Sequence, residues 1–569
     1  MKHSHSTLRS AVAAALALSS AGALAYVPTS NTDADVVLYW GGATASTLSA
    51  QELAVAAVCD TDPHLLYVKA TSGTPIDRPG NDWALACKTA AAGATKTGLP
   101  NNKRILLIKR DRGGSGVGVG PVQTKATDTA SGQISFLTVN GTTCNIAVTP
   151  GVNGAPGIVN PDGGLVPAIG CSATYTTNAL TEMGTSDIEP DKFFGINTPI
   201  VDGVGLPFRT EPDRAFETQA ALAALMFNNP VTLPLYRKLQ EAQFPVSSVC
   251  NPANAGFGSL TTDEADRPDT TNAESEACMP SLTREELNSI LTGRIVTWNQ
   301  LLKSDGTAIP GLSGAIQICR RVDGSGTQAT VNALVGSFPC DANLADGSIN
   351  IITPRVPNGT TVIGNSGSGD VDNCLHNFAT TANPYAIGNL SVEGRNNNLT
   401  RNWRFIKIDG VAPRLDRVHD GDYWFWAQQS CQLRGDQLPY NAAVGADDTV
   451  ANKTSVFNSL CGGNSANGLN SIATLLKLNG ETDPVGCANG TNLAGCGSNY
   501  TWGRSGWLAT PTTATVYDNV LSATTRPVNA YTREVTPGRV NICQTPVKAT
   551  IGTNATRGAV VAPNPTWTP

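Results

Sequence analysis

Residues 320–327 carry the densest set of groups in this chain that can bind an anion. They read Arg-Arg-Val-Asp-Gly-Ser-Gly-Thr, which places two guanidinium groups, a carboxylate, two hydroxyls and two glycines side by side. The apolar run at 315–319 predicts a strand before them, and the run at 328–335 predicts a helix after them. A strand-to-helix turn presents free backbone N–H groups at the positive end of the helix. Arg321 adds a forked pair of donors, so the segment predicts a cradle for a tetrahedral oxyanion.

Three upstream segments place small or hydroxyl-bearing residues at similar turns: Ala43-Thr44-Ala45-Ser46, Gly114-Ser115-Gly116 and Ser186-Asp187. Taken singly, each is more often a plain turn than a site. The first two follow expected strands at 35–40 and 104–109, and a helix is expected at 47–58. This alternation predicts an α/β architecture with mainly parallel sheets, in which ligands bind at the carboxyl ends of the strands.

The four segments together resemble the periplasmic phosphate-binding proteins of ABC phosphate uptake systems, including the DING-type members. The likeness is most specific at 320–327, which is similar to the family's Arg-Arg-x-Asp-Gly-Ser-Gly-Thr motif, and it covers about 33–430 with interruptions. Further similar segments follow in the family's order: 41–44, 184–187, 291–299, 383–388 and 408–413. The resemblance implies a two-lobed type 2 periplasmic-binding-protein fold with disulfide-tied loop insertions.

The resemblance also implies a phosphate site between the two lobes. The first lobe would contribute Thr44, the Ala45 backbone N–H, Ser115 and Asp187, and the second would contribute Arg321, Ser325, the Gly326 N–H and Thr327. Asp323 would pair with Arg321 and orient it. A desolvated dianion needs many fixed donors, and hydroxyl and N–H groups supply them without a full countercharge.

Asp187 bears on which anion such a site would accept. A carboxylate beside a bound anion is repulsive unless the anion carries a proton to donate, which phosphate does at neutral pH and sulfate does not. Asp187 is therefore expected to reject sulfate, although a solvated turn aspartate or a helix cap is the alternative. The sequence departs from the family at two positions. Ala45 stands where the family often has an aromatic residue or leucine. Ser115 lies in Gly-Ser-Gly-Val-Gly rather than in the family's Ser-Gly-Gly run, so its alignment with the family motif can slip by one residue.

The N-terminus has the pattern of a cleavable signal peptide at 1–25, and no cysteine follows for a lipid anchor. A periplasmic or secreted protein is therefore expected, with no membrane insertion because no later run reaches about 18 apolar residues. The net charge of −6 argues against nucleic acid as a partner. The resemblance leaves an ABC permease as a possible partner and implies no cofactor.

The 14 cysteines fit an oxidising compartment, although their spacing cannot establish connectivity. Sequence-near pairs are guesses only: Cys59/Cys87, Cys144/Cys171, Cys250/Cys278, Cys431/Cys461 and Cys487/Cys496.

The expected domain division follows the resemblance and the composition. It comprises lobe I at 26–200 with an insertion at about 121–175, lobe II at 201–390, a return to lobe I at 391–430, and 431–569 as an irregular disulfide-rich extension or the completion of lobe I. Crossings between the lobes are expected near 194–209 and 385–394.

Two other function classes remain open. A phosphate-ester hydrolase is disfavoured because Ser115 and Ser325 lie in no Gly-x-Ser-x-Gly motif, and the three histidines after the signal segment show no metal-ligand spacing. A secreted structural or adhesive protein on the same fold is the second alternative, suggested by the disulfides and the polar insertions. The sequence thus favours a phosphate binder that is not an enzyme and holds no metal.

Overall fold

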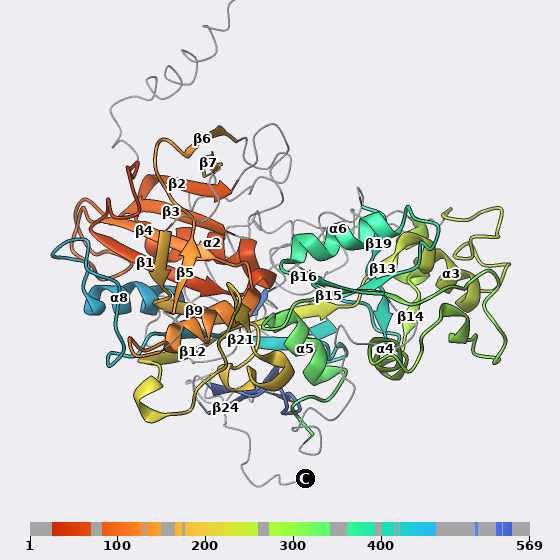
Figure 1. Cartoon of the computed structure of the whole chain (residues 1–569). Coiled ribbons are helices and arrows are strands. Elements are labelled where there is room, and N and C mark those ends of the chain that lie inside the picture. Colours follow the sequence, from red (N-terminus) through yellow and green to blue (C-terminus); the bar gives the residue numbers. More distant parts are fainter. Residues whose placement is uncertain are drawn as a thin grey trace, which may run out of the picture.

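The computed structural model describes residues 26–69, 82–128, 132–148, 166–172, 177–259, 272–341, 361–392, 401–414, 417–418, 421–461, 507–509, 531–536 and 539–548. The expected signal peptide and the expected Cys487/Cys496 pair lie outside these residues. Two mixed sheets with flanking helices form the main body, and they lie side by side in Figure 1. In the described part of the chain, no helix combines the length and the apolar character needed to cross a membrane.

The larger sheet has 11 strands. Ten of them follow the order β18 (Leu390–Ser391), β12 (Thr218–Asn228), β21 (Trp426–Leu433), β9 (Met183–Ser186), β1 (Val36–Gly42), β4 (Arg104–Arg110), β3 (Asp82–Lys88), β2 (Thr61–Lys69), β7 (Ala168–Cys171) and β6 (Cys144–Ala147), and β22 (Trp507–Ala509) pairs with β12. The central strand β1 is parallel to both β4 and β9.

The expectation of mainly parallel sheets is wrong for the larger sheet. β3 is antiparallel to β2 and β4, and β21 is antiparallel to β9 and β12. Parallel neighbours need a crossover connection, commonly a helix, whereas antiparallel neighbours do not. The chain between β3 and β4 contains no helix, so these strands pair as a direct return.

The smaller sheet has five strands. Their order is β16 (Thr361–Asn365), β15 (Gln317–Arg321), β17 (Ile387–Gly388), β13 (Val231–Thr232) and β19 (Trp403–Arg404). The helices of this part are α3 (Leu233–Gln243), α4 (Arg284–Leu291), α5 (Gly326–Leu334) and α6 (Ser368–Phe378). β15 runs parallel to β16 and β17, so its carboxyl end and the start of α5 form the predicted strand-to-helix turn.

The chain passes from one sheet to the other between β12 and β13, between β17 and β18, between β18 and β19, and between β19 and β21. The second passage lies within the crossing expected at 385–394. The crossing expected at 194–209 is wrong: that segment forms a two-stranded hairpin, and the chain then enters β12 of the larger sheet.

The remaining pairs are two-stranded. They are β5 (Gln133–Phe136) with β8 (Thr177–Leu180), β10 (Ile200–Val201) with β11 (Val204–Gly205), β14 (Ser281–Leu282) with β20 (Lys407–Ile408), β23 (Tyr531–Thr532) with β26 (Val547–Lys548), and β24 (Glu534–Thr536) with β25 (Arg539–Val540).

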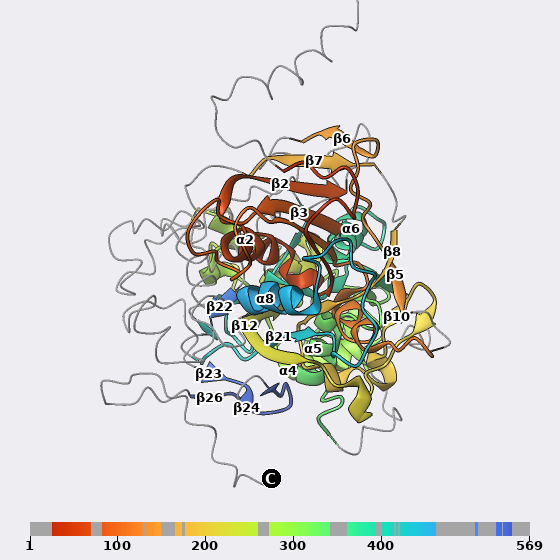
Figure 2. The same ribbon diagram turned by 90° about the vertical axis from the view of Figure 1, so that its left-hand side faces the viewer.

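The larger sheet is buried on both faces, which explains the nearly continuous apolar character of β1 and β4. Successive side chains of a strand point to opposite faces. Leu38 and Trp40 accordingly join the main core, whereas Val37 and Tyr39 join a second apolar cluster. The helices α2 (Thr47–Val58) and α8 (Val450–Cys461) pack together against the main-core face, as Figure 2 shows.

The chain after residue 431 is more regular than expected up to Cys461. β21 is buried along its whole length and inserts between β9 and β12, and α8 follows it. The sequence Trp-Ala-Gln-Gln-Ser-Cys-Gln-Leu shows no apolar alternation. Several of its polar side chains nevertheless lie in the interior, where they make buried hydrogen bonds. One example is Gln432, whose Nε2 donates to the Gly118 carbonyl at 2.5 Å.

Six disulfides join described cysteines, and four of the guessed pairs are confirmed. These are Cys59–Cys87, Cys144–Cys171, Cys250–Cys278 and Cys431–Cys461. Two further bonds were not foreseen, Cys319–Cys374 and Cys340–Cys543, because their partners are separated by 55 and 203 residues. Sequence proximity therefore identified the local bonds only.

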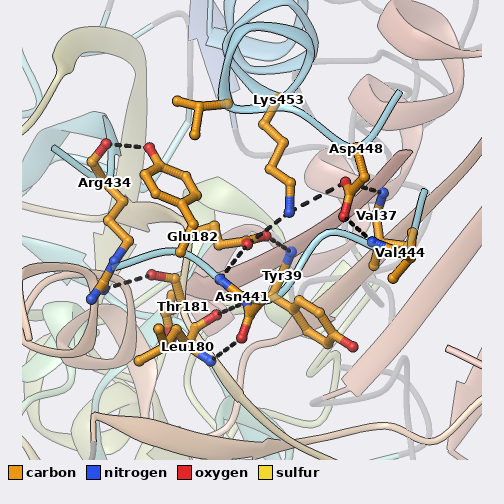
Figure 3. Close-up of polar contacts among 12 residues, drawn as sticks. Val37, Tyr39, Leu180, Thr181, Glu182, Arg434, Asn441, Val444, Asp448 and Lys453 are labelled. Atoms are coloured by element: carbon orange, nitrogen blue, oxygen red, sulfur yellow. Dashed lines mark hydrogen bonds and ion pairs between the residues drawn. The ribbon is translucent and has the colours of Figure 1, made fainter. Parts of the chain in front are cut away.

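A buried ionic cluster completes the edge of β1 (Figure 3). β9 pairs with β1 only from Trp40 onward. Upstream of that point, the Tyr39 N–H donates to Glu182 Oε2 at 3.2 Å, and the Val37 N–H donates to Asp448 Oδ1 at 3.1 Å. Two carboxylates thus satisfy alternate N–H groups that a neighbouring strand would otherwise bind.

Lys453 from α8 bridges this pair of carboxylates. Its Nζ lies 2.7 Å from Glu182 Oε1 and 3.3 Å from Asp448 Oδ1, and all three side chains are buried. The cluster therefore ties α8 to the central strand that precedes the first candidate turn.

We expect Lys453→Met to lower the free energy of unfolding by about 3–5 kcal/mol, because it leaves two buried carboxylates without their cation. Lys103→Met is the control. Lys103 and Asp447 form a partly exposed ion pair at 2.7 Å, and its loss should lower the stability far less than the loss of Lys453 does, because solvent screens exposed ion pairs. Urea denaturation of the oxidised proteins measures both, and equal losses would contradict the role given to the buried cluster.

Candidate functional site

Three of the predicted turns lie next to one another at one edge of the larger sheet. β9, β1 and β4 are neighbours and run parallel, so their carboxyl ends meet there. Thr44 and Ala45 lie in the 3-10 turn η1 (Thr44–Ser46) after β1, and Ser115 lies in η2 (Gly114–Gly118) after β4. Asp187 directly follows β9. All four residues are buried.

The fourth predicted turn comes from the smaller sheet. Arg321 is the last residue of β15, and Gly324 takes a φ of 82°, which favours glycine. Ser325 caps α5, since its Oγ accepts from the Gln328 N–H. Gly326 and Thr327 are then the first two residues of the helix, where backbone N–H groups have no acceptor within the helix.

Hydrogen bonds join the two halves directly. Arg321 Nη2 donates to Thr44 Oγ1 at 2.8 Å, and the Gly116 N–H donates to the Gly324 carbonyl at 2.7 Å. Glycine is required at 326, because a Cβ there would collide with Ser115 Oγ and lie 2.8 Å from Asp187 Oδ2. The structure therefore brings all eight predicted site residues together in one buried region between the sheets.

The Arg321 guanidinium is fully buried and held by the turn between β16 and α6. Nε donates to the Asn365 carbonyl at 3.2 Å, Nη2 to the Ser366 carbonyl at 2.9 Å and Nη1 to Ser368 Oγ at 3.2 Å. Burial lowers the pKa of Arg321 to about 10, with the Asp187 charge opposing this shift, so the group stays cationic at neutral pH. This turn was not predicted, although its polar Asn-Ser-Gly-Ser run after an apolar segment is typical of a strand-to-helix turn.

The pairing expected between Asp323 and Arg321 is wrong. Asp323 lies 2.7 Å from Arg320 Nη2 and is partly exposed. Consecutive residues of a strand point to opposite faces, so Arg320 faces away from the site while Arg321 faces into it. Backbone carbonyls and hydroxyls orient Arg321 in place of a carboxylate.

Asp187 is held by two hydrogen bonds from the larger sheet. Its N–H donates to Ser115 Oγ at 3.0 Å, and its Oδ1 accepts from Gln429 Nε2 at 2.8 Å. Burial raises the pKa of the Asp187 carboxyl, whereas the Gln429 amide, the Arg321 and Lys109 charges and Ser115 act to lower it. Gln429 was not predicted as part of the site, because its polar strand was not recognised.

The site combines unused donors with one acceptor. Thr327 Oγ1 is buried and has no hydrogen-bond partner among the described residues. It lies at the N-terminus of α5, where an anion is stabilised by the helix dipole. Within the described segments, no group of three His, Cys, Asp or Glu side chains is arranged to hold a metal ion. The buried hydroxyl, the helix N-terminus and the Arg321 guanidinium are chemically suited to bind a small oxyanion.

Comparisons with known proteins give weak structural likenesses only. No protein-family model and no curated protein matches the chain. A putative phosphate ABC transporter substrate-binding protein with bound phosphate from Clostridium perfringens aligns with 77% of this chain and 96% of its own, at 12% identity and a TM-score of 0.34. A phosphate binding protein from Stenotrophomonas maltophilia aligns with 55% of this chain and 73% of its own, at 13% identity and a TM-score of 0.28. An ABC-type phosphate transport receptor from Vibrio cholerae aligns with 49% of this chain and 74% of its own, at 14% identity and a TM-score of 0.25. Likenesses at this level assign no function to this chain.

Glu189, two residues beyond Asp187, is a second buried carboxyl beside the site. The Ile542 N–H donates to its Oε1 at 2.7 Å, and Lys192 Nζ lies 3.5 Å from the same oxygen. Burial raises the pKa of Glu189 to about 7, while Lys192 opposes the shift. The folded protein therefore binds this proton more tightly than the unfolded chain does.

We expect this carboxyl to make the protein less stable as the pH rises. Its contribution is fully present below the ordinary pKa of 4.5 and is lost as the pH passes about 7. The loss is about 3 kcal/mol, at 1.36 kcal/mol per pKa unit. Glu189→Gln should remove this dependence, so the difference in unfolding free energy between variant and wild type should grow between pH 4.5 and 7. A difference that stays constant would show that Glu189 is ionised throughout.

Proposed function

We propose that the protein binds inorganic phosphate, as hydrogen phosphate, between its two sheets and acts as an exported solute-binding protein. One observation carries the proposal: Arg321, the start of α5 and the hydroxyl-bearing turns at Thr44 and Ser115 meet the buried carboxylate of Asp187 in one place. Hydroxyls and helix N–H groups bind a dianion without a full countercharge. Arg321 supplies a cation whose hydrogen bond to Thr44 joins the two halves at this point.

The carboxylate sets the choice of anion. Ionised Asp187 can accept a hydrogen bond from the proton of hydrogen phosphate, whereas sulfate would place an anionic oxygen against it. A buried acceptor left facing an anion costs the full desolvation of that group. The proposed ligand is therefore a tetrahedral oxyanion that carries a proton.

The two sheets would serve as the lobes of a type 2 periplasmic-binding-protein fold that closes on its ligand. Two of the hydrogen bonds between the halves, Arg321–Thr44 and Gly116–Gly324, would form on closure and break on opening. The six disulfides support an oxidising location, the periplasm or the exterior. An ABC permease that receives the phosphate remains a prediction from the resemblance.

Calorimetric titration of protein refolded or dialysed free of ligand tests the proposal directly. Thr327→Val should weaken phosphate binding by about 1.5–3 kcal/mol, the value of a hydrogen bond to a charged group, or roughly 10- to 150-fold in Kd. Thr330→Val is the matched control. It makes the same change one turn along α5, where the hydroxyl bonds to the Gly326 carbonyl at 2.8 Å, and should bind phosphate nearly as wild type does.

Two results of this titration would count against the proposal. Equal weakening in both threonine variants would remove Thr327 from the site. No heat with phosphate in the stripped wild-type protein would favour the structural or adhesive alternative.

The Asp187→Asn variant tests the choice of anion. Sites that pair one buried polar group with its ligand reach a discrimination of about 10⁴–10⁵, and we expect the variant to lose most of it. Sulfate should then displace phosphate in competition titrations at neutral pH, because an amide N–H can donate to it. If sulfate stays excluded while phosphate still binds, Asp187 does not select the anion.

A further inference from the structure

We propose that Gln429 is a positioning residue for the anion selectivity described above, an inference that rests on the proposed function. Its amide engages one oxygen of Asp187 and leaves the other to face the ligand. Gln429 Nε2 donates to Asp187 Oδ1 at 2.8 Å and to Ser46 Oγ at 3.1 Å. All three side chains are buried, so this contact fixes the rotation of the carboxylate.

The second oxygen of Asp187 points to the helix of the other half. A Cβ built on Gly326 would lie 2.8 Å from Oδ2, which places that oxygen at the N-terminus of α5. A carboxylate free to rotate could present either oxygen or both. With Oδ1 taken by Gln429, a single acceptor faces the position of the anion, which matches a ligand with a single proton.

Gln429 also favours the ionised form of Asp187 on which sulfate rejection depends. The charged groups that act on this carboxyl from the packed elements are Arg321 of β15 and Lys109 of β4, and both favour ionisation. Burial acts in the opposite direction and raises the pKa. Loss of the amide donor removes one stabiliser of the charged form, so a neutral, proton-donating carboxyl persists to higher pH.

Gln429→Met tests this role, because methionine keeps the length of the side chain without a donor. We expect phosphate binding to persist and sulfate competition to begin at a higher pH than in wild type, because the neutral carboxyl persists to higher pH. Gln432→Met makes the same change in the same strand, at a residue that bonds the Gly118 carbonyl rather than Asp187, and should keep the wild-type pH profile.

An unchanged sulfate profile in Gln429→Met would overturn the inference, as would an equal shift in both variants. Failure of the wild-type protein to bind phosphate would instead overturn the proposed function, so the two failures are distinguishable.

A second inference comes from an independent observation, the disulfide Cys340–Cys543. We infer that residues 531–536 and 539–548, the C-terminal strap, limit the opening of the two halves and slow the release of phosphate. This inference also rests on the proposed function for its ligand.

Three contacts fix the strap to the larger sheet. Gln428 Oε1 in β21 accepts from the Arg533 N–H at 2.9 Å, and the Arg533 guanidinium lies 4.8 Å from the centre of the Trp426 ring. The Ile542 N–H bonds Glu189, which follows β9. Arg533 also donates to the carbonyls of Ile542 and Gln544, so the strap is held together internally.

The disulfide connects this strap to the other half of the site. Cys340 follows α5, whose first residues form the cradle, and Cys543 lies next to the residue that bonds Glu189. The bond therefore spans the same two parts of the molecule as Arg321 and Thr44 do, but covalently. If the halves separate, α5 can move only as far as the strap and residues 335–340 allow.

The double variant Cys340→Ser/Cys543→Ser tests the strap, with Cys250→Ser/Cys278→Ser as the matched control. The control bond joins residues that lie between α3 and β14 and does not touch the strap. We expect the phosphate dissociation rate constant to rise roughly 5- to 150-fold in the first variant only, the range typical of coupling between two sites. Stopped-flow displacement measures the rate.

A wild-type rate of phosphate release in the first variant would overturn the inference about the strap. Equally faster release in both variants would overturn it too. Small-angle scattering of the two variants without ligand gives a readout that does not depend on phosphate. Expansion confined to the Cys340→Ser/Cys543→Ser protein supports the strap, and identical radii of gyration overturn it even if no phosphate binds.

Discussion

The burial of the Arg321 guanidinium is the constraint on which the arrangement of the candidate site depends. A charged group without solvent contact is tolerated only when its donors are matched by acceptors. Arg321 finds carbonyls in the turn after β16 within its own half and a hydroxyl, Thr44, in the other half. Because these partners come from both sheets, the satisfied state of this one side chain requires the halves to be together. Because the halves are together, Asp187 of the larger half also lies near the start of α5.

Hydrogen bonds between buried amide side chains connect the site to the segments where the chain crosses between the sheets. Asn229 donates to Asn389 at 2.6 Å where the chain crosses between the sheets, and Asn389 donates to Gln328 at 2.9 Å on α5. Gln328 donates to Asn332 at 3.0 Å, and Asn332 donates to Asn197 of the larger half at 2.8 Å. Hydrogen bonds link these amides in sequence, so a shift of any one of them would break a buried hydrogen bond. The crossing segments and the cradle are thus positioned by the same set of contacts.

The larger half shows a related use of polar burial. β21 places glutamine and serine side chains in the interior, and carboxylates of Glu182 and Asp448 replace a strand beside the first residues of β1. Both features put polar groups where an apolar pattern would be expected. Their hydrogen bonds connect β1, β9 and β21. Thr44 and Asp187 follow the first two of these strands, and Gln429 lies in the third.

The sequence by itself determined the local elements: the strands β1, β4 and β15 and the helices α2 and α5. The resemblance to a known family implied the eight residues that the structure gathers, and four of the six described disulfides match pairs guessed from sequence proximity. These are readable because period, turn chemistry and a contiguous motif are local properties. Tertiary structure decided the antiparallel pairings, the place of β21, the partner of Asp323 and the Cys340–Cys543 bond. Each of these depends on residues far apart in the chain, and on polar groups whose burial is stable only when a distant partner is present.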